Sequence, residues 1–285
     1  MDPLRFELCD VFTDRPFTGN ALAVFTDANG LDAITMQALA REMNLSESAF
    51  VLHPRSNDAD ALVRIFTPTM ELPFAGHPTL GTALVLSQAL PGENTIRLET
   101  GRGIVPVRVA ASEGRARFGR MQQPIPTREA FATTQELLTA LRISAPILPI
   151  ELYDNGPRYV LIELETPAEI AALNPDLARL AGFGSYAFVL FARKYSSWKV
   201  RVFAPGEGIA EDPATGAAAG PLAIHLATHG RISFGDEVTI EQGAEMARPS
   251  TLYARAFGSS ERIERVEVGG KGVMVATGEF DRSLL

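Results

Sequence analysis

One acidic side chain in this sequence has surroundings suited to moving a proton. Glu47 stands between Ser46 and Ser48, directly before the apolar run Ala49-Phe50-Val51-Leu52, which is typical of a buried strand. Partial withdrawal from water raises the pKa of a carboxyl group, because burial disfavours the charge. Such a group can both take and return a proton near neutral pH. The alternative is a surface acid at a helix end, and the residue pattern alone leaves both interpretations open.

Two further polar residues lie beside glycines. His77 follows Gly76 at the start of a predicted helix, where the positive end of the helix dipole lowers the pKa of an imidazole. We therefore expect a neutral ring that forms hydrogen bonds with polar groups of a substrate. Asp212 precedes Thr215-Gly216-Ala217, which begins a second predicted helix. A structural histidine and a helix N-cap aspartate are the alternatives.

These residues belong to a sequence motif that occurs twice. Residues 63–68 read V-R-I-F-T-P and residues 200–205 read V-R-V-F-A-P. A few positions later, E-L-P-F-A-G at 71–76 is matched by E-D-P-A-T-G at 211–216. The duplication predicts two similarly folded domains, with a ligand site in the crease where equivalent loops meet.

Each copy then continues into a stretch without charged side chains. Residues 78–90 and 217–227 are apolar nearly all round, which predicts central helices wrapped by the strands of their own domains. Gly230 is placed to cap the second helix. Buried helix N-termini near Gly76 and Gly216 offer free amide groups to an anion, so we expect a small substrate that carries a carboxylate. Well-capped core helices without a ligand are the alternative.

Composition limits the class of protein. The chain has 285 residues, is 46% hydrophobic and carries a net charge of −8, which argues for a globular protein with two domains and against a nucleic-acid partner. The sequence predicts no secretory signal and no membrane span. Cys9 is the only cysteine and is expected to be a packed thiol, which fits a reducing, cytoplasmic compartment.

Periodicity predicts a mixture of α and β structure. We expect a helix at 32–43, a second from residue 134 to about 141 and a third within 167–181, with an interdomain linker at 122–127. A hairpin is expected around residues 112–114, and alternating β structure from residue 237 onward. The remaining predicted strands are 4–12, 20–26, 49–53, 61–67, 95–109, 115–122, 147–153, 158–164, 186–192 and 198–204.

His225 and His229 form an i,i+4 pair that could lie on one face of a helix. No Glu or third ligand accompanies the pair in the sequence, and His225 falls within the apolar central helix. The sequence therefore predicts no metal site.

Several segments together resemble the PhzF-like phenazine-biosynthesis family over essentially the whole chain. They are R-E-M-N-L-S-E-S-A-F-V-L (41–52), R-I-F-T-P…E-L-P-F-A-G-H-P (64–78), M-Q-Q-P-I-P-T (121–127), D-N-G-P-R-Y-V (154–160), E-D-P-A-T-G-A-A-A-G-P-L-A-I-H-L (211–226), R-P-S (248–250) and Gly19-Asn20. The resemblance implies an α+β, diaminopimelate-epimerase-like fold of two pseudo-symmetric domains, each a curled sheet around a central helix. The implied domains are 1–124 and 128–285, with the final strand able to cross back to the first and the active site in the cleft between them.

The resemblance also implies isomerisation of trans-2,3-dihydro-3-hydroxyanthranilate, a cyclic carboxylate, by a homodimer without a cofactor. Its catalytic residues would be Glu47 as acid/base, His77 and Asp212. Its substrate-binding residues would be Asn20, Gly76, Thr215, Gly216 and Ala217.

Ala217 departs from the family pattern, in which a serine commonly follows the glycine of the T-G motif. The helix-end amides remain, but one hydroxyl donor is absent. The alternative is therefore an isomerase or epimerase of the same family that acts on a different amino acid-like substrate.

Overall fold

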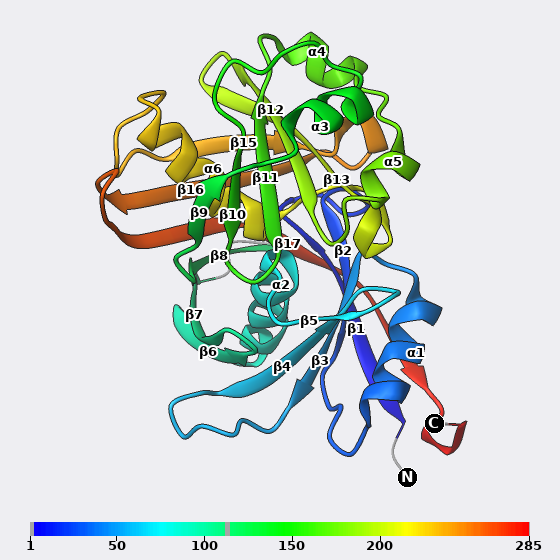
Figure 1. Ribbon diagram of the computed structural model, residues 1–285. Coiled ribbons are helices and arrows are strands. Elements are labelled where there is room, and N and C mark those ends of the chain that lie inside the picture. Colours follow the sequence, from blue (N-terminus) through cyan, green and yellow to red (C-terminus); the bar gives the residue numbers. More distant parts are fainter. Residues whose placement is uncertain (1–2, 112–114, 285) are drawn as a thin grey trace. The chain divides into compact units, whose positions relative to one another are not determined.

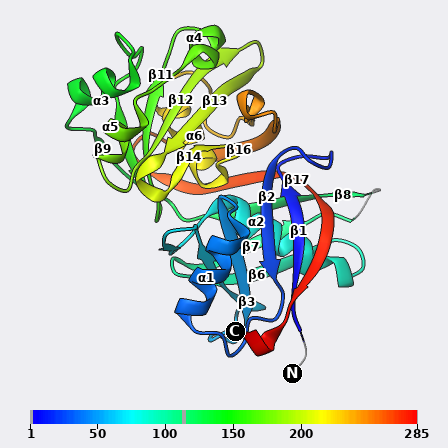
Figure 2. The same ribbon diagram turned by 90° about the vertical axis from the view of Figure 1, so that its right-hand side faces the viewer.

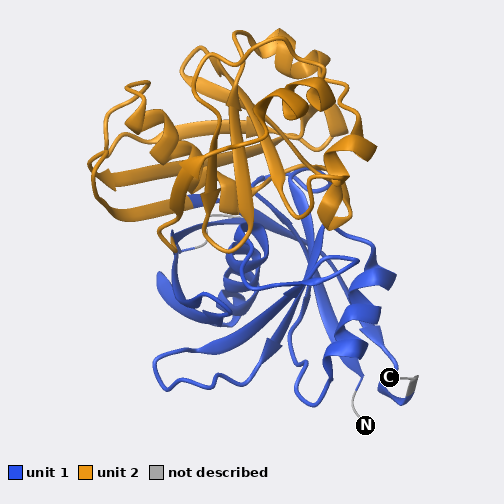
Figure 3. Cartoon of the chain, in the orientation of Figure 1, with its two compact units in different colours: residues 1–122, 269–285 blue, residues 123–268 orange. Residues whose placement is uncertain are grey.

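The chain divides into two compact units that share the last strand. The computed structural model describes residues 3–111 and 115–284. Unit 1 comprises Met1–Gln122 and Gly269–Leu285, and unit 2 comprises Gln123–Val268 (Figure 3). Strand β17 (Ile263–Phe280) begins in unit 2 and ends in unit 1. Between the units, only residues 124–126 separate strands β8 and β9.

Unit 1 is a curled sheet in the order β17-β1-β2-β3-β4-β6-β7-β8. The β2–β3 and β4–β6 pairs are parallel and the other pairs are antiparallel, while the short β5 pairs with β4. The strands are β1 (Leu4–Val11), β2 (Asn20–Phe25), β3 (Glu47–Leu52), β4 (Ala61–Phe66), β5 (Glu71–Leu72), β6 (Asn94–Thr100), β7 (Gly103–Val109) and β8 (Ala116–Gln123).

Unit 2 repeats this topology in the order β9-β10-β11-β12-β13-β15-β16. Here β11–β12 and β13–β15 are the parallel pairs and β14 pairs with β13, so β14 is the counterpart of β5. The duplicated sequence motif therefore corresponds to a duplicated fold. The strands are β9 (Thr127–Ala130), β10 (Glu151–Asp154), β11 (Arg158–Glu163), β12 (Ala187–Lys194), β13 (Ser197–Ala204), β14 (Ile209–Asp212), β15 (Val238–Gln242) and β16 (Ser250–Gly258).

Each unit encloses one central helix, as the uncharged stretches predict. Helix α2 (Gly76–Leu86) is buried from Gly76 to Val85 and packs on β1, β2, β3, β6 and β7 (Figure 1). Helix α6 (Gly216–Thr228) is buried from Gly216 to Ala227 and packs on β11 and β16. Close packing requires glycine within both: a Cβ on Gly81 would lie 2.5 Å from Leu22 Cδ2, and one on Gly220 would lie 2.2 Å from Gln123 Oε1.

The end of α6 confirms the predicted glycine cap. Gly230 has φ +69, a conformation that costs glycine little. Its N–H donates to Ala227 O and that of Arg231 donates to Leu226 O, the two bonds of a Schellman motif.

Outer helices cover the other faces of the sheets. In unit 1, α1 (Ala33–Met43) packs on β3 and β4 (Figure 2) and is capped by Asp32, whose side chain accepts from Thr35 N. In unit 2, α3 is Thr134–Leu141, α4 is Pro167–Ala172 and α5 is Leu177–Ala181. The single helix expected within 167–181 is therefore wrong. The chain leaves α4 before Pro175, because the residue preceding a proline disfavours helical geometry. Single 3-10 turns occur at Ser87–Ala89, Pro205–Glu207, Ala244–Met246 and Arg282–Leu284.

The single strand expected at 95–109 is also wrong, because the chain reverses within it. β6 and β7 pair antiparallel, with Thr100 opposite Gly103. Gly103 has φ +101, and Thr100 Oγ1 donates to Gly103 O at 2.8 Å. A glycine in the left-handed region permits this tight turn, and apolar alternation on either side conceals it in the sequence. The hairpin expected around 112–114 lies outside the described residues.

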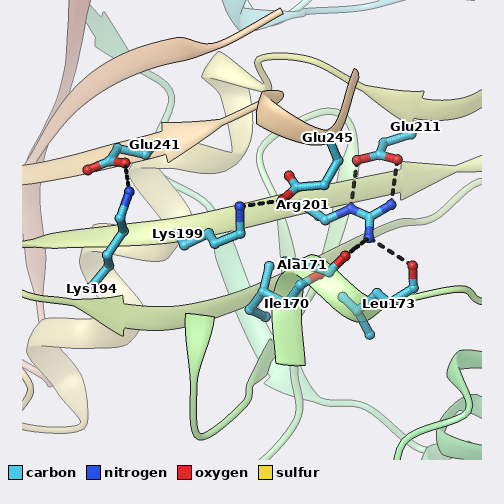
Figure 4. Close-up of polar contacts among 9 residues, drawn as sticks. All are labelled: Ile170, Ala171, Leu173, Lys194, Lys199, Arg201, Glu211, Glu241 and Glu245. Atoms are coloured by element: carbon cyan, nitrogen blue, oxygen red, sulfur yellow. Dashed lines mark hydrogen bonds and ion pairs between the residues drawn. The ribbon is translucent and has the colours of Figure 1, made fainter. Parts of the chain in front are cut away.

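The duplicated motif places a bidentate ion pair in each unit. Arg64 binds Glu71 through Nε and Nη2 at 2.7 and 2.6 Å, and Arg201 binds Glu211 in the same way at 2.8 Å for both bonds (Figure 4). Arg201 also donates through Nη1 to backbone carbonyls of Ile170, Ala171 and Leu173. Each pair fixes the short strand, β5 or β14, that leads into the central helix.

Cys9 is buried, as expected, and burial raises the pKa of its thiol. Among the described residues, no helix is long and apolar enough to cross a membrane.

Candidate active site

Three of the predicted site residues meet in unit 1. Glu47 is the first residue of β3 and is 7% exposed. His77 lies in the first turn of α2, and Asn20 begins β2. His77 Nδ1 is 3.3 Å from Glu47 Oε2 and 3.2 Å from Asn20 Nδ2. The carboxyl group is therefore buried, and an imidazole nitrogen lies against it.

The imidazole of His77 is neutral, as expected. Complete burial lowers its pKa to about 3, while a backbone hydrogen bond at Ala21 acts in the opposite direction. The largest cause is thus desolvation. A neutral ring can accept the amide proton of Asn20 at Nδ1 or donate from Nδ1 to Glu47. The tautomer of the ring decides which of these two hydrogen bonds forms.

The N-terminus of α2 has no side-chain cap. Its N-cap is Ala75, which has no side chain able to accept a hydrogen bond, and the first helical residue is Gly76. Helix N-termini of this kind present amide groups that favour an anion. The arrangement in unit 1 therefore combines a buried proton acceptor with a potential anion-binding helix end.

The other four predicted residues, Asp212, Thr215, Gly216 and Ala217, lie together in unit 2. Asp212 ends β14, and its Oδ2 accepts from Thr215 Oγ1 at 2.7 Å. Gln242 closes the turn: its Nε2 donates to Asp212 O at 2.7 Å and to Thr215 Oγ1 at 2.9 Å, and its Oε1 accepts from Thr215 N at 3.1 Å. The N-cap of α6 is Thr215 rather than Asp212, and again no side chain caps the helix. The alternative role of Asp212 as an N-cap is therefore wrong.

Two buried amides, absent from the predicted set, support the start of α6. Gln123 Nε2 donates to Gly216 O at 2.8 Å, and Asn155 Nδ2 donates to Ala217 O at 2.9 Å. The second bond has a clear purpose, because Pro221 lacks the N–H that would bind Ala217 O four residues earlier. The sequence could have identified both residues, because Gln123 and Asn155 lie in two segments that resemble the family, 121–127 and 154–160. Gln242 lies in neither segment.

A third cluster overturns the reasoning about His225 and His229. Glu151, from β10, supplies the carboxylate that the sequence did not place beside them. Its Oε2 lies 2.9 Å from His225 Nδ1 and 3.2 Å from His229 Nε2, and it accepts from Tyr153 OH at 3.0 Å. Burial raises the pKa of Glu151, but these hydrogen bonds outweigh it and hold the pKa at about 2. Packing of α6 against the sheet brings Glu151 to residues more than seventy positions away.

Fold and site together define an α+β protein of the epimerase type, with two related units and an uncapped central helix in each. The phenazine biosynthesis-like model PhzC-PhzF matches residues 9–278, and the chain belongs to this family. Trans-2,3-dihydro-3-hydroxyanthranilate isomerase from Pseudomonas aeruginosa is 49% identical over 274 residues, covering 96% of this chain and 98% of the relative. The protein of the same name from Pseudomonas chlororaphis is 48% identical with the same coverage.

Solved structures agree on the fold. A predicted epimerase from Pseudomonas aeruginosa superposes with a TM-score of 0.83 at 31% identity, covering 97% of this chain and 99% of that one. The expected epimerase-like fold is confirmed.

Proposed function

We propose that this protein isomerises trans-2,3-dihydro-3-hydroxyanthranilate to the 6-amino-5-oxocyclohexene carboxylate, a step of phenazine biosynthesis. The observation that carries the proposal is the buried Glu47 carboxyl group beside His77, in a chain 49% identical to an isomerase of that name. A buried carboxyl group next to a neutral imidazole suits the transfer of a proton from one carbon atom to another.

In the proposed reaction, the Glu47 carboxylate removes the proton from C3 of the cyclohexadiene. The electron pair moves through the diene toward the substrate carboxylate, and the same Glu47 returns the proton to C1 on the same face. The C3–H bond breaks, the C1–H bond forms, and the resulting enol becomes the ketone. A single base at both ends fits a suprafacial shift.

The other residues bind and orient the substrate in this proposal. Amide groups at Gly76, Gly216 and Ala217 hold its carboxylate, where negative charge grows in the transition state. His77 and Asn20 bind its polar groups, and Asp212, held by Thr215, binds its amino group.

Proton exchange in D₂O tests the proposal directly. Purified protein is incubated with trans-2,3-dihydro-3-hydroxyanthranilate, and the product is examined by NMR. We expect turnover with hydrogen or deuterium entering C1 on one face only. A protein that binds the substrate but neither turns it over nor exchanges its C3 proton would contradict the proposal.

A second candidate, an isomerase or epimerase acting on a different amino acid-like substrate, is favoured by one observation. Ala217 occupies the position where the family commonly has serine, and it is 1% exposed in the first turn of α6. The alanine removes one hydroxyl donor that the phenazine precursor would be expected to use. Comparing turnover of the phenazine precursor with that of other cyclic amino acids distinguishes the two candidates.

We further infer, from the family resemblance, that the enzyme acts as a cytoplasmic homodimer and that its chemistry uses no metal or organic cofactor. Sedimentation of the purified protein at assay concentration tests the dimer, for which a mass twice that of the chain is expected.

A further inference from the structure

We propose that Glu151, His225 and His229 form a binding site for a divalent transition-metal ion, with zinc as the first candidate. The site lies within unit 2 and takes no part in the proton transfer assigned to Glu47. Its ligands would be Oε2 of Glu151, Nδ1 of His225 and Nε2 of His229.

The ligand atoms lie close to the spacing of a coordination sphere. Zinc binds imidazole nitrogen and carboxylate oxygen at about 2.0–2.2 Å, so adjacent ligand atoms of a tetrahedral site lie about 3.3–3.6 Å apart. Glu151 Oε2 is 2.9 Å from His225 Nδ1 and 3.2 Å from His229 Nε2, and all three atoms lie within 4.8 Å of one another. A metal ion would replace the protons now shared in this cluster.

The donor set selects the class of ion. Two imidazoles and one carboxylate are the protein ligands of many zinc and other transition-metal sites, whereas calcium and magnesium prefer oxygen alone. His225 lies in the last turn of α6 and His229, four positions later, is the C-cap residue of that helix, so the two side chains lie close to one face of its end. The carboxylate comes from the neighbouring sheet.

The surroundings supply outer hydrogen bonds and a route for entry. Tyr153 OH donates to Glu151 Oε2, which is typical of the partners that orient metal ligands. The side chains of Glu151 and His229 are 17% and 20% exposed, while that of His225 is fully buried. An ion can therefore arrive from solvent on the side of His229.

One nearby cation acts against binding. Arg128 Nε lies 4.0 Å from Glu151 Oε1, whereas the histidines contact Oε2, and the Arg128 side chain is 35% exposed. Its exposure allows solvent screening and movement away from an incoming ion.

The site would fasten the C-terminal end of α6 to β10. Since the other end of α6 presents Gly216 and Ala217, an ion here would stabilise the helix without contacting that end. The expected effect is on stability and not on turnover.

Metal binding to the intact protein tests the proposal. The chain is stripped with a chelator, and zinc is added while affinity and stoichiometry are measured by calorimetry and Tm by thermal unfolding. Cobalt serves as a spectroscopic probe, because its visible absorption reports nitrogen and oxygen ligands. The variants are His229→Gln, chosen because the side chain is partly exposed, and His53→Gln, an exposed histidine elsewhere, as the matched control.

We expect one zinc ion per chain and a Tm increase of at least about 5 °C when free zinc exceeds its Kd about 100-fold. His229→Gln should weaken binding by more than about 100-fold, since a ligand loss exceeds the effect of an outer-shell change. His53→Gln should bind as the wild type does. Failure of the wild type to bind zinc, or unchanged affinity in a folded His229→Gln, would overturn the proposal.

Discussion

At the scale of single residues, the site in unit 1 depends on burying a carboxyl group and an imidazole together. Glu47 and His77 are almost fully withdrawn from solvent, and His77 Nδ1 contacts both Glu47 and Asn20. Keeping the ring neutral leaves it free to donate or accept a hydrogen bond near the base. The contributions of Glu47, His77 and Ala217 can each be measured by substitution.

Replacing Glu47 with Gln should abolish turnover while preserving the shape of the site. The amide cannot accept a proton, and a general base contributes at least about 100-fold to the rate. Substrate binding should stay within about tenfold, since an amide keeps the hydrogen-bonding volume of the carboxyl group. Turnover above a few per cent of the wild-type rate, measured by product formation, would show that Glu47 is not the base.

His77 should make the folding stability depend on pH. Its pKa is about 3 in the folded chain, against an ordinary value of 6.5. Between these values the unfolded chain binds a proton here and the folded chain does not. The contribution is therefore complete above pH 6.5 and is lost as pH falls, at about 1.4 kcal/mol per unit.

Urea unfolding of wild type and His77→Gln between pH 7 and pH 5 measures this contribution. The variant should lose less stability on acidification than the wild type, whereas exposed His53→Gln should follow the wild type. Parallel curves for wild type and His77→Gln would mean that the ring charges in the folded state.

Ala217→Ser tests the substrate assignment. If the phenazine precursor is the substrate, one added hydroxyl should raise kcat/KM by up to about tenfold, because a hydrogen bond contributes about 0.5–1.5 kcal/mol. Serine costs little at a helix start. Reduced activity of the variant on another cyclic amino acid that the wild type prefers would favour the second candidate function.

At the scale of secondary-structure elements, α6 relies on side chains from outside the helix. Pro221 removes one helical hydrogen bond, and Asn155 Nδ2 donates to the carbonyl of Ala217 in its place. Gln123 holds the preceding carbonyl, that of Gly216. These two hydrogen bonds hold the first residues of α6, Gly216 and Ala217, whose amide groups bind the substrate carboxylate in the proposed function.

Asn155→Ala should lower the free energy of unfolding by about 1–3 kcal/mol, because it leaves the buried Ala217 carbonyl without its donor. The same substitution in a Pro221→Ala background should cost clearly less, since replacing the proline restores a backbone N–H that can donate to that carbonyl. A double-mutant cycle measured by urea unfolding gives the coupling. Additive costs would indicate that Asn155 acts through some other contact.

At the scale of the whole molecule, the two units share one topology, but their equivalent Arg–Glu ion pairs differ in burial. The equivalent ion pairs Arg64–Glu71 and Arg201–Glu211 have the same bidentate geometry. The side chains of the first pair are 23% and 41% exposed, and those of the second are 9% and 16% exposed. Removing one partner of a buried ion pair costs more stability than removing one partner of an exposed pair, because the remaining charge stays buried without a counter-charge.

Arg201→Ala should therefore destabilise the protein by about 3 kcal/mol or more, because Glu211 and three backbone carbonyls lose a buried partner. Arg64→Ala, the matched change in unit 1, should cost about 1 kcal/mol or less. Chemical denaturation of both variants checks the comparison. Equal losses would show that the environment of the pair does not determine its contribution.

Much of the architecture could be predicted from the sequence because its signals are local. Helices without charge on any face must be buried on every face, so α2 and α6 were identifiable from composition. The repeated V-R-x-F motif indicated two related units, whereas the roles expected of Glu47, His77 and Asp212 came from the family resemblance, because local pattern left each of them open. Local pattern failed where the chain turns at Gly101 and Gly103, and where a proline divided a helix, at 173–175.

The tertiary structure alone decided which distant side chains meet. Packing of α6 against the sheet brings Glu151 to His225 and His229 and Asn155 to Ala217, and Gln242 of β15 reaches the turn between Asp212 and Thr215. The tertiary structure also buries His77, and this desolvation is the largest cause of its lowered pKa. Periodicity reports which face of an element is apolar, but partners far apart in the chain are set by how sheets pair and curl around a helix.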